Sequence, residues 1–189
     1  MKILAFAATS SSRSINKQLV TYATRQISND HQGTEVDVLD INDYELPLFS
    51  EDKEAEIGQP ELAKAFIEKI AASDALIISF AEHNGSYTVA YKNIFDWASR
   101  VKPKVFQNKP MILLATSPGP GGASSVLSAA TTSAPYFDGD VKASISIPSF
   151  YDNFDSDKNQ ITNNDLNQQL LTAINRLLKN TTTELQQAS

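Results

Sequence analysis

Five short runs of apolar residues, separated by segments with helical spacing, constrain most strongly how this chain can fold. The runs are rich in Val, Ile and Leu and lie at 3–8, 36–39, 75–80, 111–115 and 141–147. Runs of this length, bounded by polar residues, predict buried strands. The first, third and fourth runs do not alternate apolar with polar residues, which is typical of strands covered on both faces.

Between the runs, apolar residues recur three or four positions apart, as they do along one face of a helix. The pattern predicts helices near 15–27, 62–70, 91–98, 121–133 and 166–177. Thr162 and Asp165 are spaced as a capping box at the start of the last one. Strands that alternate with helices favour a parallel sheet, because right-handed crossovers place each helix against the sheet. We therefore predict an α/β fold, a three-layer, doubly wound, five-stranded parallel sheet.

The length of 189 residues suits one domain, which we place at 1–180 and follow with a polar C-terminal tail at 181–189. Two irregular stretches, 41–58 and 148–161, are candidate rims of a functional site.

Charge and composition exclude several classes of function. Lys and Arg number 16 against 22 Asp and Glu, so the net charge of −6 repels nucleic-acid phosphates and anionic membranes. The absence of Cys removes disulfides, thiolate nucleophiles and Cys-based zinc sites, and two His residues leave little for a metal site. No run approaches the roughly 18 apolar residues of a membrane helix. We expect a cytoplasmic protein without a metal site, a nucleic-acid partner or a membrane partner.

Ligands of open parallel sheets bind beyond the carboxyl ends of the strands, and three unusual loops follow predicted strands. The first, at 9–16, reads Thr-Ser-Ser-Ser-Arg-Ser-Ile-Asn. Hydroxyls, an amide and free N–H groups at the start of a helix favour a phosphate site. Alternatively, Ser14 only caps the helix and the serines form a flexible turn. The loop has neither the Gly-Lys-Ser/Thr of a P-loop nor the three glycines of a dinucleotide fingerprint, which favours a single phosphate.

The second loop, at 81–87, contains Asn84 and Gly85. Glycine lets the backbone approach a ligand, and the Asn amide offers donors and an acceptor in one plane, which suits a flat heterocycle. A plain Asn-Gly turn is the alternative. The third loop, at 116–122, has glycines and few side chains, consistent with a closely packed ring or with turn chemistry. Its glycines resemble a dinucleotide fingerprint only superficially, since Ser124 stands in the third glycine position.

At these loops the sequence resembles the NADPH-dependent FMN reductases, flavodoxin-like proteins that include quinone, azo-dye and chromate reductases. Their pattern Gly-Ser-x-Arg-x-x-Ser-x-Asn corresponds to 8–16, where Ser14 and Asn16 match, Ser11 stands in the usual Arg position and Arg13 follows two places later. Their Pro-Glu-Tyr-Asn-Gly-Ser and Leu-Lys-Asn-x-x-Asp-Trp motifs are similar to 81–86 and 91–97, where Ala81 and His83 depart from the pattern.

The resemblance implies that the first loop holds the FMN phosphate and that the second and third loops hold the isoalloxazine ring. The cofactor-binding residues it implies are Thr9, Ser11, Arg13, Ser14, Ile15, Asn16, Glu82, His83, Asn84, Gly85, Ser86, Ser117, Gly119 and Gly121. It also implies a homodimeric enzyme in which FMN takes hydride from NAD(P)H and passes electrons to a small acceptor such as a quinone, an azo compound or free flavin. No catalytic side chain is then required. We expect Asn16→Asp to remove FMN binding without unfolding the protein.

Two other functions stay open on the sequence alone. One is a flavodoxin-like electron carrier, which binds FMN but docks on protein partners, and whose acidic surface would fit the net charge of −6. The other is a flavin-free regulatory or structural module of the same fold, because a fold alone does not fix a function.

Overall fold

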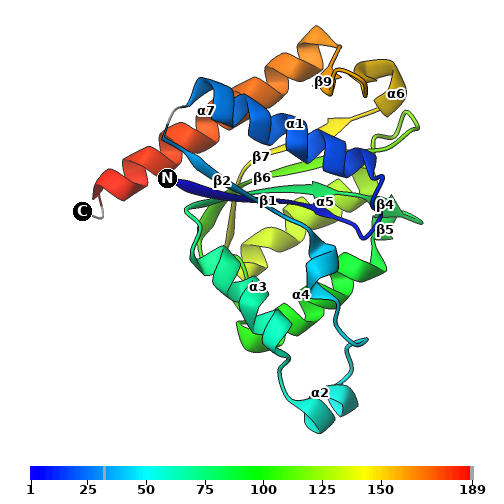
Figure 1. Ribbon diagram of the computed structural model, residues 1–189, viewed down its shortest axis with the longest axis vertical. Helices are drawn as coiled ribbons and strands as arrows, with labels where there is room; N and C mark the ends of the chain where they lie inside the picture. The colour runs from blue at the N-terminus through cyan, green and yellow to red at the C-terminus, as the bar shows by residue number, and fades with distance from the viewer. Residues whose placement is uncertain (32, 188–189) are drawn as a thin grey trace.

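A five-stranded parallel sheet forms the centre of the protein in the computed structural model, which describes residues 1–31 and 33–187 (Figure 1). The strand order is β2-β1-β3-β6-β7, the order of a flavodoxin-like doubly wound sheet. The strands are β1 (Lys2–Ala8), β2 (Glu35–Leu39), β3 (Ala75–Phe80), β6 (Lys109–Thr116) and β7 (Gly139–Ile147). The predicted fold class is therefore confirmed, and every predicted strand is found with its ends shifted by at most two residues.

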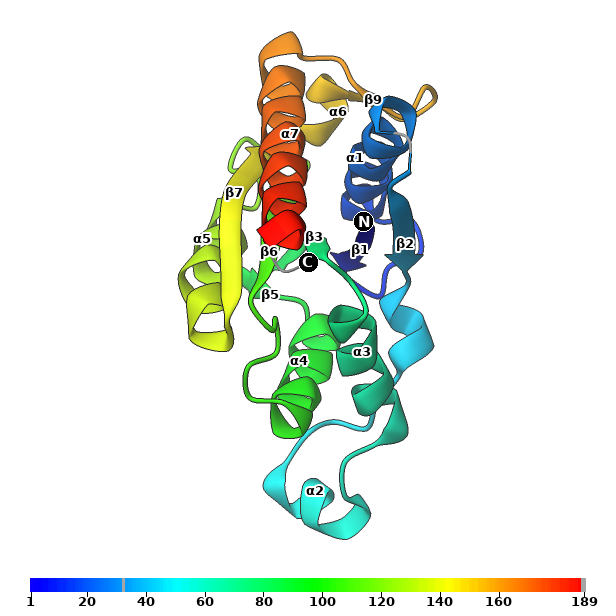
Figure 2. The same cartoon turned by 90° about the vertical axis from the view of Figure 1, so that its left-hand side faces the viewer.

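Helices cover both faces of the sheet, as Figures 1 and 2 show. The helices α1 (Ile15–Asp30) and α7 (Asn164–Gln187) cover one face, and α3 (Glu61–Ala71), α4 (Val89–Val101) and α5 (Ser124–Ser133) cover the other. Alternate strand residues serve the two cores: Ile3 and Ala5 pack under α1 and α7, whereas Leu4 and Phe6 pack on the opposite side. Burial on both faces explains the unbroken apolar runs.

The start of the last helix differs from the prediction by one residue. Asn163, not Thr162, supplies the cap, because its Oδ1 accepts the N–H groups of Asp165 (3.1 Å) and Leu166 (3.2 Å). The N–H of Thr162 is instead held by the carbonyl of Asn153, at 2.9 Å. The helix ends at Gln187 and so includes most of the segment expected as a polar tail. Residues 188–189 of that segment lie outside the described residues.

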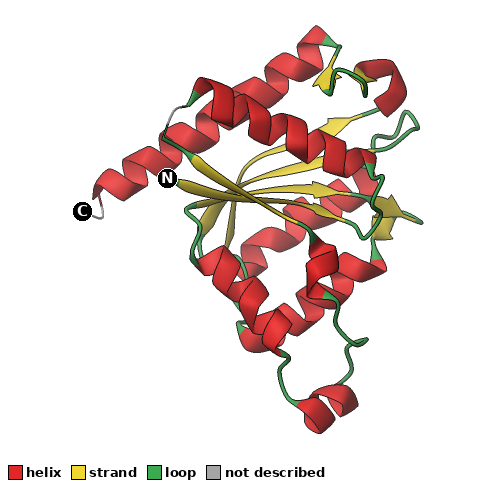
Figure 3. Ribbon diagram, in the orientation of Figure 1, coloured by secondary structure: helices red, strands yellow, loops and turns green. Residues whose placement is uncertain are grey.

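Short elements occupy the two stretches that were expected to be irregular. The first contains a 3₁₀ helix, η1 (Ile41–Tyr44), and α2 (Glu51–Ile57); the second contains α6 (Phe150–Asn153), β8 (Phe154–Asp155) and β9 (Gln160–Ile161). Ser50 caps α2, but none of the seven described residues of this helix is buried, and Figure 3 shows it standing clear of the sheet. None of the described helices has both the length and the apolar character needed to cross a membrane.

Candidate functional site

The three loops singled out by the sequence leave neighbouring strands at one edge of the sheet, which we call the carboxyl edge (Figure 3). Their strands end in register, since Phe80 of β3 pairs with Ala8 of β1 and with Ala115 of β6. From this edge α1 turns to one face, whereas α4 and α5 turn to the other. The switch point of a doubly wound sheet, where such folds bind ligands, therefore lies between β1 and β3.

Several polar groups of the first loop have no partner in the part of the chain that the structure describes. Ser14 caps α1 by accepting the N–H of Asn16 at 3.1 Å, and Thr9 accepts the N–H of Ser11 at 3.2 Å. The exposed side chains of Ser10, Ser12 and Arg13 form no hydrogen bond within residues 1–31 and 33–187. Donors that are free at the start of a helix can bind an anion, so this loop can hold a phosphate.

Asn16 is used differently, because its side chain is only 2% exposed. Its Nδ2 donates to the carbonyl of Thr116 (3.1 Å), and its Oδ1 accepts from the N–H of Thr116 (3.1 Å) and from the hydroxyl of Ser79 (2.9 Å). The amide thus fastens the start of α1 to the ends of β3 and β6. Asn16 is a positioning residue, and this geometry removes the basis for expecting Asn16→Asp to leave folding intact.

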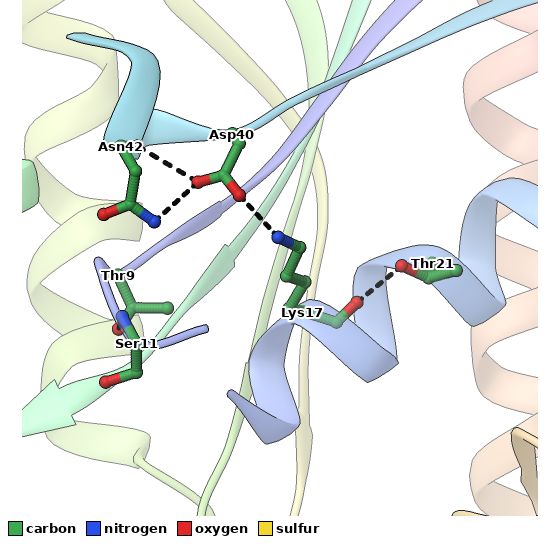
Figure 4. Close-up of polar contacts among 6 residues, drawn as sticks. All are labelled: Thr9, Ser11, Lys17, Thr21, Asp40 and Asn42. Atoms are coloured by element: carbon green, nitrogen blue, oxygen red, sulfur yellow. Dashed lines mark hydrogen bonds and ion pairs between the residues drawn. The ribbon is translucent and has the colours of Figure 1, made fainter. Parts of the chain in front are cut away.

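An ion pair that the sequence analysis did not single out links the start of α1 to the end of β2 (Figure 4). Lys17 of α1 lies 2.5 Å from Asp40, which follows β2 directly, and Asp40 also accepts the N–H of Asn42 at 3.0 Å. The hydrogen bond from Lys17, followed by the one from Asn42, holds the pKa of Asp40 below its ordinary value. The sequence features that could have indicated this ion pair are a Lys in the first turn of a predicted helix and an Asp directly after a predicted strand. Lys17 is paired, whereas Arg13 has no ion-pair partner among residues 1–31 and 33–187.

The second loop is a tight hairpin made of β4 (Glu82–His83) and β5 (Ser86–Tyr87). Asn84 and Gly85 have φ angles of 53° and 76°, so the Asn-Gly pair forms the turn that this dipeptide favours. Residues 83–86 are exposed. Behind the hairpin, the hydroxyl of Thr88 donates to the carbonyl of Ala8 (2.9 Å) and accepts the N–H of Tyr91 (3.2 Å). The hairpin is therefore held against the end of β1.

Glu82 joins the second loop to the third. Its Oε2 accepts the N–H of Val126 at 2.8 Å, in the first turn of α5. The cap position of α5 is Ala123, which has a left-handed φ of 60° and no side chain able to cap the helix. A carboxylate at a helix N-terminus satisfies a free N–H and suits the helix dipole. Glu82 is thus committed to the scaffold of the site.

The third loop is held by the segment that follows β7. The carbonyl of Gly119 accepts from the N–H of Ser149 (2.9 Å) and from the hydroxyl of Ser117 (3.2 Å). Gly122, which the sequence analysis did not select, has a φ of 57°, and a Cβ there would lie 2.1 Å from Oγ of Ser146. A Cβ at Gly119 or Gly121 would meet nothing within 4 Å. The loop is therefore held by β7 and the segment that follows it, whereas the space beside Gly119 and Gly121 is open.

The groups left open fit the two ends of FMN. Ser10, Ser12 and Arg13 can serve its phosphate, and Ile15, which packs its side chain against the core, can offer only its backbone. The exposed amide of Asn84 and the unobstructed backbone of Gly85, Gly119 and Gly121 can lie along a flat ring.

Comparisons with known proteins agree with this geometry. The family model of NADPH-dependent FMN reductase matches residues 1–146. The chain is 36% identical over 93 residues to an NADPH:quinone oxidoreductase of Arabidopsis thaliana, covering 49% of this chain and 46% of the relative. It is 38% identical over 87 residues to an NAD(P)H-dependent FMN reductase of Pseudomonas aeruginosa, covering 46% and 45%. The chain thus spans about half the length of the curated relatives it matches.

A solved structure is similar over nearly its whole length. It is the flavoenzyme NAD(P)H:(acceptor) oxidoreductase FerB of Paracoccus denitrificans, with a TM-score of 0.71, 22% identity, and coverage of 94% of this chain and 97% of that one. This likeness supports the fold. Because the family model covers most of the chain, including all three loops, the chain belongs to the family of NADPH-dependent FMN reductases.

Proposed function

We propose that this chain binds FMN along the carboxyl edge and passes electrons from NAD(P)H to a small acceptor such as a quinone, an azo compound or free flavin. One observation carries the proposal. The first loop, whose exposed donors have no described partner, lies at the same edge of the sheet as two loops that hydrogen bonds hold to neighbouring elements. The curated relatives, named quinone oxidoreductase and FMN reductase, support the same assignment.

In this proposal the residues of the chain bind and orient. The loop at 9–14 receives the phosphate, with Arg13 as its cation, and residues 83–86, Ser117, Gly119 and Gly121 border the ring. Glu82, Asn16 and Thr88 act behind them, since each is bonded to a neighbouring element. Bound FMN supplies hydride acceptance and electron release, so the protein needs no acid or base at the reacting atoms.

We include a homodimer in the proposal. Leu48 and Val89 are 74% and 72% exposed. They line a hollow of about 180 Å³, together with Phe49 and with Tyr87 of the hairpin. Exposed apolar residues around a hollow are typical of an interaction surface. Sedimentation of the native chain and of Leu48→Asp with Val89→Asp tests this, since a monomeric native protein would reject it. A cytoplasmic location is also proposed, and cell fractionation tests it.

An absorbance spectrum of the pure protein, before and after NADPH is added without oxygen, tests the main proposal. We expect a flavin spectrum that bleaches with NADPH and returns when a quinone is added. A flavin spectrum unaffected by NADPH would favour an electron carrier. Failure to bind FMN on reconstitution would favour a flavin-free module.

In turnover, NADPH and acceptor should compete for one flavin face, so initial rates should give parallel double-reciprocal lines. Intersecting lines would contradict this.

A further inference from the structure

A cavity lies beside the carboxyl-edge loops, between α4 and α5 on one face of the sheet, and Tyr87 of the hairpin borders it. Its volume is about 190 Å³, and aromatic side chains dominate its wall, among them Phe80, Tyr91, Phe95 and Phe137. Such a volume exceeds the roughly 150 Å³ of an engineered apolar cavity that binds benzene. The cavity can therefore hold one substituted six-membered ring.

The hydroxyl of Tyr91 is a polar group in the wall of this largely apolar cavity. The residue is 4% exposed, yet its hydroxyl forms no hydrogen bond with any part of the chain that the structure describes. Every fully enclosed side-chain nitrogen or oxygen of the described residues has a partner. The unpaired hydroxyl must therefore be accessible from the cavity that Tyr91 lines.

The hydroxyl is available as a donor. Desolvation, followed by the neighbouring Tyr87, raises the pKa of Tyr91 well above its ordinary value, so the group keeps its proton at neutral pH. The hydroxyl of Tyr87, by contrast, is paired with that of Ser133 at 3.2 Å. A donor at the wall of a mostly apolar cavity is poorly solvated, and a ligand with an acceptor oxygen can give it a hydrogen bond.

The rim of the cavity adds a restriction on charge. Lys92 and Asp96 border it and form an ion pair at 2.6 Å, so the rim presents no net charge. An ionised ligand would lose its hydration in the aromatic interior without gaining a counter-ion. An uncharged ligand meets no such cost.

We propose that this cavity is a second small-molecule site, which takes an uncharged single-ring aromatic compound carrying a carbonyl oxygen and holds that oxygen with the hydroxyl of Tyr91. Tyr87 of the hairpin contributes to the wall, but none of the residues assigned to FMN lines the cavity, so the site is distinct from the proposed flavin site. Binding here does not depend on FMN.

Two probes of similar shape test the donor. Acetophenone carries the carbonyl and ethylbenzene does not, and each is titrated into the full chain by NMR, with and without FMN. We expect acetophenone to bind about threefold to tenfold more tightly, the range of one net hydrogen bond. Tyr91→Phe should remove that difference and leave ethylbenzene binding unchanged. FMN should not compete with either probe.

A filled cavity tests the location. Ala130 lines the cavity and is buried, whereas Ala129 is exposed on the same helix. Ala130→Leu should abolish binding of both probes, and Ala129→Leu should leave it intact. Binding that survives Ala130→Leu, equal affinity of the two probes for the native chain, or displacement by FMN would overturn the proposal. If Ala130→Leu does not fold, the comparison of native chain with Tyr91→Phe decides alone.

Discussion

The exposed part of the first loop, at 10–13, and the second and third loops share the carboxyl edge of the sheet but are held by the rest of the protein to different extents. In the first loop, Ser10, Ser12 and Arg13 have no partner among the residues described. In the other two, Glu82 is bonded to Val126 and the carbonyl of Gly119 to Ser149. A doubly charged phosphate can order an open loop through its own strong hydrogen bonds. A flat ring offers fewer, so its slot has to be built beforehand.

The largest effect is expected where the two regions are joined. In Asn16→Asp, an oxygen replaces the Nδ2 that donates to the carbonyl of Thr116, and a charge is placed at a 2% exposed position. We expect the free energy of unfolding to fall by about 3 to 5 kcal/mol. Urea unfolding of the FMN-free protein measures it. Asn84→Asp, the same change at an exposed position, should alter stability little. Unchanged stability of Asn16→Asp with lost FMN binding would instead place Asn16 at the phosphate.

A smaller loss of stability is expected from a substitution at Gly122, in the third loop. The Cβ of Gly122→Ala would meet Oγ of Ser146 at 2.1 Å and the backbone of Pro148 at 3.1 Å, at a left-handed φ of 57°. Steric conflict and backbone strain together should cost about 2 to 3 kcal/mol. Gly121→Ala, which has open space, should keep the stability and weaken FMN binding if the ring lies there. Equal stability of the two variants would show that the third loop is not held by β7 and the segment that follows it.

These residues show what could be read from the sequence and what could not. The strands were predicted closely, because buried runs of Val, Ile and Leu are local signals, and the loops followed from the strand ends. Partners were not predictable: Asn16 meets Thr116 across 100 positions, and Glu82 meets Val126 across 44. The motif implies that Asn16 and Glu82 lie at the cofactor, but it does not predict the long-range contacts that their side chains make within the protein. The helix α2 lacked any periodic apolar face, because none of its residues is buried.

Removing the link between the second and third loops should have an intermediate effect. Glu82→Ala leaves the N–H of Val126 without its acceptor, and we expect a loss of about 1 to 2 kcal/mol, the usual range for a helix cap. Glu82→Gln keeps an acceptor oxygen and should lose less than half as much. Thermal unfolding of the FMN-free protein measures both. Glu68→Ala removes the same charge from an exposed position of α3. If it matched Glu82→Ala, the effect would be one of net charge and not of capping.

The smallest structural effect and the clearest ligand effect should come from the open loop. The guanidinium of Arg13 is bonded to no described residue, so Arg13→Ala should leave the free energy of unfolding within about 0.5 kcal/mol of native. A charged hydrogen bond to the phosphate would be lost, and FMN should bind about tenfold more weakly. Fluorescence quenching of FMN measures this, and the loss should shrink at high salt, because screening weakens an exposed contact. Arg25→Ala, which removes the same charge from the side of α1 near Asn159, is the matched control. An equal loss of affinity in both variants would mean that Arg13 acts only through the general field, and the open loop would no longer differ from the fixed ones by a specific contact.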